Sequence, residues 1–291
     1  MSKVKGIILS GGSGSRLYPL TLGVSKQLLP VYNKPMIYYS LSVLMLSDIR
    51  EVLIITTPQD NINYKRLLGN GSDLGINIQY RIQDQPRGLA DAFIIGKDFI
   101  KKDNVCLILG DNIFYGSNFS EKLKKSFENL ENNKATIFAY PVSDPERYGV
   151  VQIDKNGNPK KIIEKPKKAI SNLAVTGLYF YPNDVVEKVK KIRASARGEL
   201  EITSINELYL NDQRLRLEIL NRGFAWLDMG TNESLIDASI FVKAVENRQG
   251  LRIACIEEIA YKKKFINKKK FLRLISKFKN NSYGKYLSNV I

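Results

Sequence analysis

The sequence contains no histidine, and this absence excludes more than any other feature of its composition. A Ser-His-Asp or Cys-His mechanism requires an imidazole base, and a histidine-ligated zinc site requires an imidazole ligand, so both are excluded. Catalysis would have to depend on carboxylates, lysine, arginine and metal ions. Reactions of phosphate esters can be catalysed with these groups.

Cysteine and long apolar stretches are also scarce. Of the two cysteines, Cys106 stands in the apolar run 105–109, where we expect it to pack as a small hydrophobic residue. This cysteine usage fits a reducing cytoplasm. No apolar stretch approaches 18 residues, so no membrane span is expected. The first apolar run, residues 6–9, leads directly into a glycine-rich turn and therefore predicts a strand instead of a signal peptide.

The chain is long and strongly basic. Its 291 residues, 44% of them hydrophobic, can bury a sizeable core as one large domain or two small ones. The net charge of +16 raises the hypothesis of nucleic-acid binding. However, the lysines are spread along the chain, and several clusters lie on amphipathic patterns where a charged outer face is ordinary. We therefore expect no nucleic-acid partner. The main clusters are Lys122, Lys124 and Lys125; Lys160 and Lys161; Lys188, Lys190 and Lys191; residues 262–264; and residues 268–270.

The most informative segment is the glycine-rich turn after the first apolar run. Gly11, Gly12 and Gly14 lack a Cβ, so the backbone can direct successive N–H groups at one anion. Arg16 and Lys26 add positive charge nearby. This arrangement suits the triphosphate of a nucleotide, although three glycines alone are equally typical of a tight connection. A dinucleotide fingerprint is disfavoured because the third glycine is missing, and a P-loop is disfavoured because no Gly-Lys-Ser/Thr follows.

The first half of the chain alternates apolar runs with helical patterns. Strands are predicted at residues 6–9, 52–55, 105–109 and 136–140, and helices at 36–46, 88–99 and 121–130. The continuous apolar runs are typical of strands with helices on both faces. This order predicts an α/β fold with a doubly wound, mostly parallel (mixed) sheet and with ligands at the carboxyl ends of the strands.

The second half is more mixed. It predicts strands at 149–153, 161–164 and 175–181, a hairpin turn at 154–158, and helices at 184–191 and 204–210, followed by helical stretches and basic loops. Neither a flexible linker nor an internal repeat is apparent. We therefore predict a single domain, residues 1–291, with a nucleotide-binding part at about 1–145. The remainder, about 146–291, would form a smaller sugar-binding subregion and a C-terminal helical region.

Two acidic residues follow short apolar segments. Asp111 comes after the run 105–109 and one glycine, and Asp228 ends the segment 226–228 before Met229 and Gly230. A lone aspartate is more often a cap or turn residue. In a chain that handles phosphates, the pair is a plausible site for Mg²⁺, which prefers one or two carboxylates together with phosphate oxygens and water.

These motifs together resemble the signature of the sugar-phosphate nucleotidyltransferases, in particular the short single-domain members that transfer thymidylate. The resemblance covers nearly the whole chain. Its motifs are Gly11-Gly-Ser-Gly-Ser-Arg-Leu-Tyr-Pro-Leu-Thr, Ser25-Lys-Gln-Leu-Leu-Pro-Val-Tyr, Lys34-Pro-Met-Ile-Tyr-Tyr, Leu109-Gly-Asp-Asn, Asp144-Pro-Glu-Arg-Tyr-Gly-Val-Val, Glu164-Lys-Pro, Val175-Thr-Gly-Leu-Tyr-Phe-Tyr, Arg197-Gly-Glu-Leu-Glu-Ile-Thr, Trp226-Leu-Asp and Glu246-Asn-Arg-Gln-Gly-Leu.

The resemblance implies a Mg²⁺-assisted reaction of dTTP with α-D-glucose 1-phosphate that yields dTDP-glucose and pyrophosphate. This reaction is the first step of dTDP-L-rhamnose and deoxysugar biosynthesis for polysaccharides. It also implies a cytoplasmic homotetramer with a possible allosteric site for a dTDP-sugar. Neither nucleic acid nor a membrane is an implied partner.

Site residues follow from the same matching. The implied catalytic residues are Arg16, Lys26, Asp111, Asp228 and Lys165, with Asp111 and Asp228 as the metal ligands. The implied nucleotide-binding residues are Leu9, Gly11, Gly12, Ser13, Gly14, Ser15, Arg16, Lys26, Gln27, Gln83, Gly88 and Asp111. The implied sugar-phosphate-binding residues are Asn112, Tyr148, Gly149, Glu164, Lys165, Val175, Arg197 and Trp226.

The chain departs from the family pattern at three positions. Arg87 and Asp91 stand where an acid and a glutamine are usual, which could alter base preference or only a surface charge. Met229 replaces the usual threonine beside Asp228, which we expect to affect packing more than ligation. The nearest alternative is the same reaction with UTP or another nucleotide, as in a UDP-glucose pyrophosphorylase. A metal-dependent glycosyltransferase is disfavoured because Gly110-Asp-Asn replaces its Asp-x-Asp motif.

Overall fold

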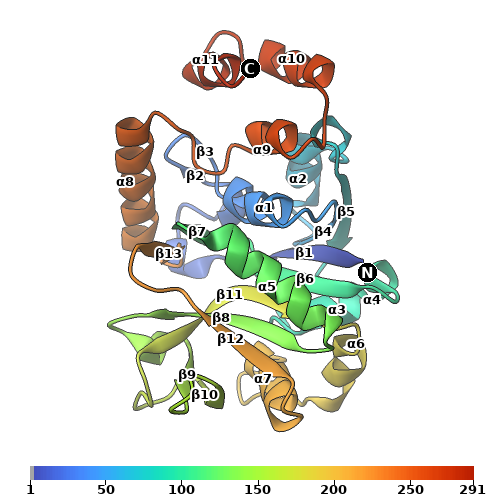
Figure 1. The fold of residues 1–291 in the computed structure, drawn as a ribbon, viewed down its shortest axis with the longest axis vertical. Coiled ribbons are helices and arrows are strands. Elements are labelled where there is room, and N and C mark those ends of the chain that lie inside the picture. The colour runs from blue at the N-terminus through green and yellow to red at the C-terminus, as the bar shows by residue number, and fades with distance from the viewer. Residues whose placement is uncertain (1–2) are drawn as a thin grey trace.

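The computed structural model describes residues 3–291 and is built around one nine-stranded mixed sheet (Figure 1). The main path of hydrogen-bonded strands is β10-β9-β11-β6-β1-β4-β5, and β8 pairs with both β11 and β12. The strands of this sheet are β1 (Val4–Ser10), β4 (Glu51–Thr56), β5 (Asn77–Ile82), β6 (Asn104–Leu109), β8 (Ala135–Pro141), β9 (Gly149–Ile153), β10 (Pro159–Glu164), β11 (Leu173–Tyr181) and β12 (Leu215–Ile219).

The pairing directions divide the sheet as the sequence predicted. Strand β1 is parallel to β4 and β6, and β4 is parallel to β5, which is the doubly wound part. Strand β11 is antiparallel to β6 and β8, and β9 and β10 form the antiparallel hairpin predicted around residues 154–158. The predicted mixed α/β fold is confirmed. Strand β5 was missing from the prediction because several of its polar residues are exposed or half-exposed, and β12 was also missing.

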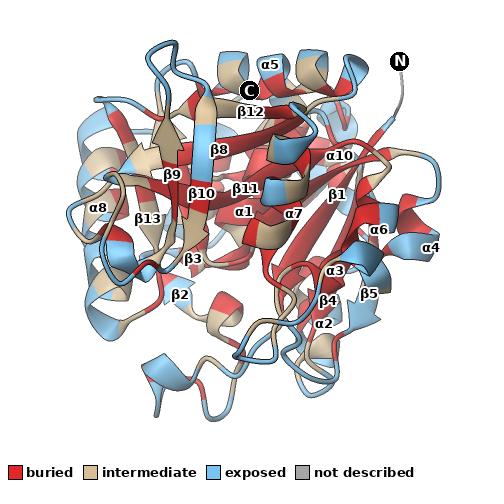
Figure 2. Ribbon diagram, turned by 90° about the horizontal axis from the view of Figure 1, so that it is seen from below, coloured by how far each residue is buried: buried red, intermediate tan, exposed pale blue. Residues whose placement is uncertain are grey.

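Two separate apolar cores lie on the two faces of this sheet. Alternate residues of β1 divide between them: Ile8 packs with α1, α5 and the C-terminal helices, whereas Ile7 and Leu9 pack with α3, α6 and α7. In Figure 2 the central strands are almost entirely buried, whereas the outer faces of α4 and α8 are exposed. The helices are α1 (Ile37–Leu46), α2 (Asn61–Leu68), α3 (Asp91–Ile95), α4 (Lys97–Ile100), α5 (Phe119–Glu131), α6 (Val185–Lys188), α7 (Ile202–Asn211), α8 (Asn232–Gln249), α9 (Ile256–Lys262), α10 (Lys268–Lys277) and α11 (Ser282–Ser288).

One predicted helix differs from the structure. The pattern predicted a continuous helix over residues 88–99, but helical structure begins at Asp91 and is divided at Gly96 into α3 and α4. Residues before Asp91 instead bond to a distant segment, because Ala90 N donates to Leu200 O and Leu200 N donates to Arg87 O. A tertiary contact therefore overrides local helical periodicity here.

Two small sheets complete the architecture. The hairpin β2 (Pro30–Val31) and β3 (Lys34–Pro35) follows the glycine-rich segment, and β7 (Asn112–Gly116) pairs antiparallel with β13 (Phe224–Asp228). Helix α8 begins with a capping box in which Thr231 and Ser234 bond each other's backbone N–H groups. Within residues 3–291, no helix has the length and hydropathy required to span a bilayer.

Candidate active site

A polar cavity of about 290 Å³ lies beyond the carboxyl end of β6. Parallel strands direct their carboxyl ends to one edge of a sheet, which is where ligands bind in doubly wound folds. The cavity takes its walls from segments that are far apart in the sequence. The predicted site residues that line it are Arg16, Asp111, Asn112, Tyr148, Gly149, Glu164, Lys165, Val175, Arg197, Trp226 and Asp228.

The glycine-rich segment forms a tight loop after β1. Gly12 and Gly14 have φ angles of 95° and 61°, which glycine adopts at little cost. The loop is held by Gly14 O, which accepts hydrogen bonds from Leu17 N at 2.8 Å and Thr21 Oγ1 at 2.8 Å. The loop therefore has the irregular backbone that a phosphate-binding segment requires.

Lys26 joins this loop region to the end of β6. Its ammonium group forms an ion pair with Asp111 Oδ2, across 85 positions of sequence. Asn112 Nδ2 donates to the other oxygen of Asp111 at 2.9 Å. Burial alone would raise the pKa of Asp111, but Lys26 and the Asn112 amide outweigh it and hold that pKa below its usual value.

Asp228 reaches the same place from β13. Its strand register places it opposite Asn112, and Met229 N donates to Asp111 O at 3.1 Å. Burial raises the pKa of Asp228, and the negative charge of Asp111 raises it further. Two carboxylates therefore share one region of the cavity.

Three neighbours surround Asp228. Tyr148 OH donates to Asp228 Oδ1 at 3.1 Å, and Arg147 Nη2 lies 4.0 Å from Asp228 Oδ2. Arg16 also approaches, because a Cβ on Gly230 would lie 3.3 Å from both terminal guanidinium nitrogens of Arg16 and 3.3 Å from Asp228 Oδ2. The absence of a side chain at Gly230 thus admits Arg16 to the cavity.

One wall of the cavity carries several of the predicted sugar-phosphate residues. Glu164 Oε2 accepts a hydrogen bond from Thr203 Oγ1 at 2.6 Å, and a Cβ on Gly149 would lie 3.2 Å from the same oxygen. Arg197 Nη2 bonds Glu201 Oε1 at 2.9 Å and lies 3.4 Å from Glu164 Oε1. This wall offers carboxylates, a hydroxyl and a guanidinium group, which can bind sugar hydroxyls and a phosphate.

Lys165 has an unusual backbone conformation. Its φ angle is 42°, in the left-handed region, and its N–H donates to Tyr148 O at 3.0 Å. The side chain is exposed and lines the cavity. Its ammonium group is therefore accessible to an anionic ligand.

Other predicted nucleotide-binding residues lie around the loop and outside the cavity lining. Gln83 packs against Gly11, and Leu9 O accepts a hydrogen bond from Gly110 N at 2.9 Å. Ser13 and Ser15 are exposed on the loop.

Three predicted binding residues make hydrogen bonds or close packing contacts with other parts of the protein. Gln27 is buried, and its Oε1 accepts hydrogen bonds from Ser25 Oγ at 2.7 Å and Tyr64 OH at 3.3 Å. Asn112 is buried, and its Oδ1 accepts from Gly177 N and Trp226 Nε1 at 3.1 and 2.7 Å. At Gly88 a Cβ would lie 2.5 Å from Leu200 O, so this glycine permits close backbone packing. Of the three, Asn112 lines the cavity, and Gln27 and Gly88 do not.

Sequence reasoning missed several cavity residues. Arg147 lies directly before Tyr148 in the motif that begins at Asp144, but no role was predicted for it. The central carbon of its guanidinium group lies over the Tyr148 ring, 5.4 Å from the ring centroid. Thr203 and Glu201 contact the cavity only because α7 packs beside β10. The motif that ends at Thr203 contains both residues, so it is the sequence feature from which their role could have been predicted.

The donor set can hold a divalent cation only with help from a ligand. Residues 3–291 include no group of three or more His, Cys, Asp or Glu side chains arranged to hold a metal ion. Asp111 and Asp228 supply carboxylate oxygens, and their mutual repulsion favours a cation between them. Mg²⁺ is commonly held by one or two carboxylates with substrate phosphates and water, so the pair fits such an ion.

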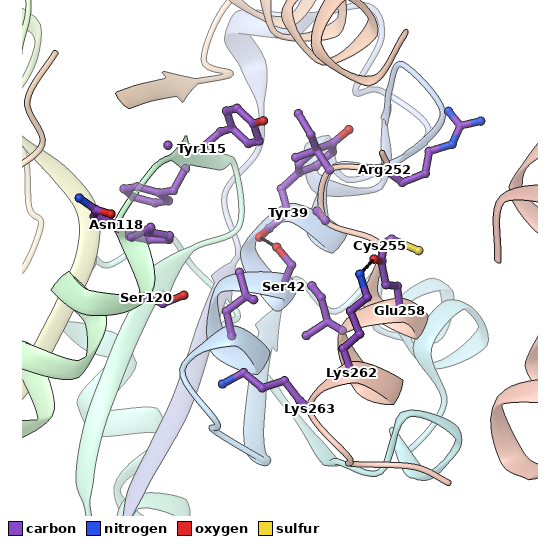
Figure 3. Close-up of a pocket in the computed structure, with 17 residues that line it drawn as sticks. Tyr39, Ser42, Tyr115, Asn118, Ser120, Arg252, Cys255, Glu258, Lys262 and Lys263 are labelled. Atoms are coloured by element: carbon purple, nitrogen blue, oxygen red, sulfur yellow. Dashed lines mark hydrogen bonds and ion pairs between the residues drawn. The ribbon is translucent and has the colours of Figure 1, made fainter. Parts of the chain in front are cut away.

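A second cavity, of about 510 Å³, has no residue of the glycine-rich loop in its lining (Figure 3). Tyr39 and Ser42 of α1 face Tyr115 of β7 across it, and α9 closes another side. Its lining is largely apolar and aromatic and includes three basic residues. These basic residues are Arg252, Lys262 and Lys263.

Comparison with known proteins identifies the family. The family model described as nucleotidyl transferase matches residues 5–245. The glucose-1-phosphate thymidylyltransferase of Neisseria meningitidis is 56% identical over 288 residues, which cover 99% of each chain. That of Mycolicibacterium smegmatis is 50% identical over 288 residues, again covering 99% of each chain.

Solved structures agree. A Bacillus anthracis structure, described as a glucose-1-phosphate thymidylyltransferase in complex with a sucrose, is 40% identical with a TM-score of 0.76 and covers 82% of this chain and 94% of its own. A UDP-glucose pyrophosphorylase complexed with UDP-glucose has a TM-score of 0.70 and covers 86% of this chain and 100% of its own; at 24% identity it shows the fold alone. The predicted resemblance is confirmed, and the chain belongs to the nucleotidyl transferase family.

Proposed function

We propose that this protein transfers thymidylate from dTTP to α-D-glucose 1-phosphate and releases pyrophosphate, forming dTDP-glucose. The observation that carries the proposal is the ion pair between Lys26 and Asp111, which brings the glycine-rich loop to the carboxylate pair. The names of the relatives, which span the whole chain at 50–56% identity, support thymidylate and glucose 1-phosphate as the substrates.

The chemistry does not require a general base. A phosphate monoester has a second pKa of about 6, so glucose 1-phosphate is mostly a dianion at neutral pH and already nucleophilic. The barrier is the repulsion between two polyanions and their alignment. Positioning and cationic stabilisation can supply the catalysis, which agrees with a chain that has no histidine.

The proposed roles follow from the positions of the cations. Arg16 binds the β- and γ-phosphates and stabilises the departing pyrophosphate with its forked donors. Lys26 leaves Asp111 for the α-phosphate region, where it neutralises charge as the new P–O bond forms. Lys165 and Arg197 hold the incoming sugar phosphate. Asp111 and Asp228 would hold Mg²⁺, which when bound neutralises phosphate charge and orients the two esters.

The part of the cavity lined by Glu164 and Gly149 would select the sugar. Glu164 accepts hydroxyl donors, and Gly149 leaves space beside it. The Trp226 and Tyr148 rings, 5.2 Å apart, form an aromatic side of the pocket against which a sugar ring can pack. Val175 adds an apolar surface to the cavity.

The proposal is tested by product analysis with the full chain. Purified protein is mixed with glucose 1-phosphate, Mg²⁺ and one of dTTP, UTP, CTP, ATP or GTP, and pyrophosphate and nucleotide sugar are quantified. We expect dTDP-glucose as the dominant product. Faster turnover with UTP would support the alternative, a uridylyltransferase of the same fold. Absence of pyrophosphate release with every nucleotide would contradict the family chemistry itself.

We further propose that the aromatic second cavity binds a regulatory dTDP-sugar. Tyr39, Tyr115 and Phe119 provide surfaces for a base and a sugar. A diphosphate would compete with Glu246 and Glu258 for the cationic groups of Arg252 and Lys262. Such a ligand should inhibit without competing with dTTP. Lys262→Ala, whose side chain is 61% exposed, should weaken inhibition and leave uninhibited turnover unchanged. Inhibition that is competitive with dTTP would contradict this assignment.

The remaining expectations concern the biological setting. We propose a cytoplasmic homotetramer that serves dTDP-rhamnose and polysaccharide biosynthesis. Helix α8 supports self-association, because Ile236 and Ile240 are both 58% exposed on its surface. Light scattering on the purified chain would test the tetramer. The single-domain organisation, with a nucleotide-binding and a sugar-binding part, is supported by the strands of one sheet that come from both parts.

A further inference from the structure

A buried pair of polar side chains lies beside the glycine-rich loop. Gln83 follows β5, and Asp91 begins α3; they are 6% and 2% exposed. Gln83 Nε2 donates to Asp91 Oδ2 at 2.9 Å. Arg87 Nε reaches the same oxygen at 3.4 Å while the rest of its side chain is largely exposed. The departure at Asp91 is therefore more than a change in surface charge.

The chemistry of Asp91 determines how the Gln83 amide is turned. An ionised carboxylate only accepts hydrogen bonds, so Gln83 must direct its NH₂ group towards Asp91 and its carbonyl oxygen away. Burial makes the opposite orientation costly, because two oxygen atoms would then face each other without a proton between them. The amide orientation is thus set by the neighbour.

The carbonyl oxygen of Gln83 is directed to the loop. A Cβ on Gly11 would lie 2.7 Å from Gln83 Oε1, so this oxygen occupies the space that glycine leaves open. Within residues 3–291, no hydrogen bond to this oxygen is formed. It is also absent from the buried polar atoms without a partner, which are Ser10 Oγ and Asn206 Nδ2. Gln83 therefore presents an accessible acceptor next to Gly11.

We propose that Asp91 is a positioning residue for base selection, which rests on the proposed nucleotidyl transfer at this site. By holding Gln83 Nε2, it presents Oε1 as an acceptor for a pyrimidine with a ring N–H, such as thymine or uracil. Cytosine has a lone pair on the corresponding ring nitrogen, which would face the lone pairs of Oε1. The pair therefore rejects cytosine and leaves the choice between thymine and uracil to other contacts.

The test replaces the acceptor-only group by one that can also donate. Asn at position 91 can bond either end of the Gln83 amide, so the amide can turn over. In Asp91→Asn we expect the preference for dTTP over dCTP, as the ratio of their kcat/KM values, to fall about tenfold, the scale of one neutral hydrogen bond. Asp91→Glu retains a carboxylate and should preserve most of the preference.

Three further variants make the result specific. Asp98→Asn removes the same charge from the exposed first turn of α4 and should leave the ratio unchanged. If Asp91→Asn folds poorly, Asp91→Ser can replace it, because the smaller serine hydroxyl also donates and accepts hydrogen bonds. We expect the same fall in the ratio. In a Gln83→Ala background, Asp91→Asn should have no further effect on the ratio, because its action passes through Gln83.

The outcomes separate this inference from the function on which it rests. If the wild-type chain uses neither dTTP nor UTP, the proposed function fails and the inference fails with it. If the wild-type chain prefers dTTP but folded Asp91→Asn and Asp91→Ser keep the wild-type ratio, the positioning role alone is overturned. An equal effect of Asp91→Asn with and without Gln83 would also overturn it, since a general structural disturbance would act in both backgrounds.

Discussion

The buried carboxylate of Glu246 and the partly exposed carboxylates of the active site are neutralised very differently. Glu246 of α8 has a side chain that is 1% exposed and accepts hydrogen bonds from Lys34 Nζ, Asn33 Nδ2, Arg252 Nη1 and Ile253 N at 2.6–2.9 Å. Two cations thus face one anion. These donors hold the pKa of Glu246 below its usual value although burial alone would raise it.

The carboxylates of the active site are less well compensated. Asp111 forms an ion pair with Lys26, whereas Asp228 accepts a hydrogen bond from Tyr148 OH and has Arg147 at 4.0 Å, with the Arg16 guanidinium near Gly230 beside it. Burial and the charge of Asp111 therefore raise the pKa of Asp228. Cationic side chains of the protein neutralise the carboxylate of Glu246. The carboxylates of Asp111 and Asp228 are left partly unneutralised, so a bound ligand would neutralise the remaining charge. Four predictions test this contrast.

The largest effect is expected at Glu246, whose charge is neutralised within the protein. Glu246→Ala should lower the free energy of unfolding by about 3–5 kcal/mol, because Lys34 would remain buried without its partner. Urea denaturation measures the change. Glu131→Ala, at the exposed end of α5, is the control and should change stability by less than about 0.5 kcal/mol. Similar stability losses in both variants would show that the network around Glu246 contributes little.

At the active-site carboxylates, substitution should reduce the catalytic rate. Asp111→Ala or Asp228→Ala should reduce turnover by at least about 100-fold, the scale of losing one electrostatic contact in a transition state. Far-ultraviolet circular dichroism would establish that the variants are folded, and pyrophosphate release would measure the rate. Near wild-type turnover in either variant would refute its assignment as a metal ligand.

A smaller effect is expected at the edge of the cavity. Lys165→Ala should raise the KM for glucose 1-phosphate about tenfold with little change in the KM for dTTP, because its ammonium group is proposed to bind only the sugar phosphate. Lys168→Ala, an exposed lysine three residues later, is the matched control. Unchanged glucose 1-phosphate kinetics in Lys165→Ala would remove this residue from the site.

The smallest effect is a gain in stability. Because the pKa of Asp228 is raised in the folded state, its protonated form is favoured there, and ionisation at neutral pH opposes folding. Without divalent cations, Asp228→Asn should therefore raise the Tm at pH 7 by about 2 °C. The gain should vanish as the pH falls below about 4, where the aspartate is protonated even in the unfolded chain. A lower Tm for Asp228→Asn at pH 7 would contradict the assigned repulsion.

The sequence predicted the parallel half of the sheet better than the loops and edges. The runs that became β1, β4, β6 and β8 are continuous and apolar because helices cover both of their faces. Strand β5 was not predicted, because it lies at the end of the sheet and contains polar residues such as Gln79 and Arg81. The break before α3 depends on Leu200, more than a hundred residues away, and no local pattern contains it.

The candidate site shows the same division. Asp111 and the glycine-rich loop could be located from sequence, because each directly follows a buried strand. Gln27 and Asn112 remain predicted ligand contacts, and their side-chain oxygens accept hydrogen bonds from Ser25 and Trp226 within the protein. Whether a polar side chain faces a ligand or a neighbour depends on packing, which a motif does not contain.

By itself, the order of residues determined the family, the positions of the parallel strands of its first half and a chemistry without imidazole, since these depend on local patterns and side-chain types. The tertiary structure alone decided which charges meet. Lys26 reaches Asp111, and Gln83 is turned by Asp91, only after strands and loops from separate parts of the chain have packed together. Electrostatic and hydrogen-bond energies depend on distances of a few ångströms, and folding sets those distances.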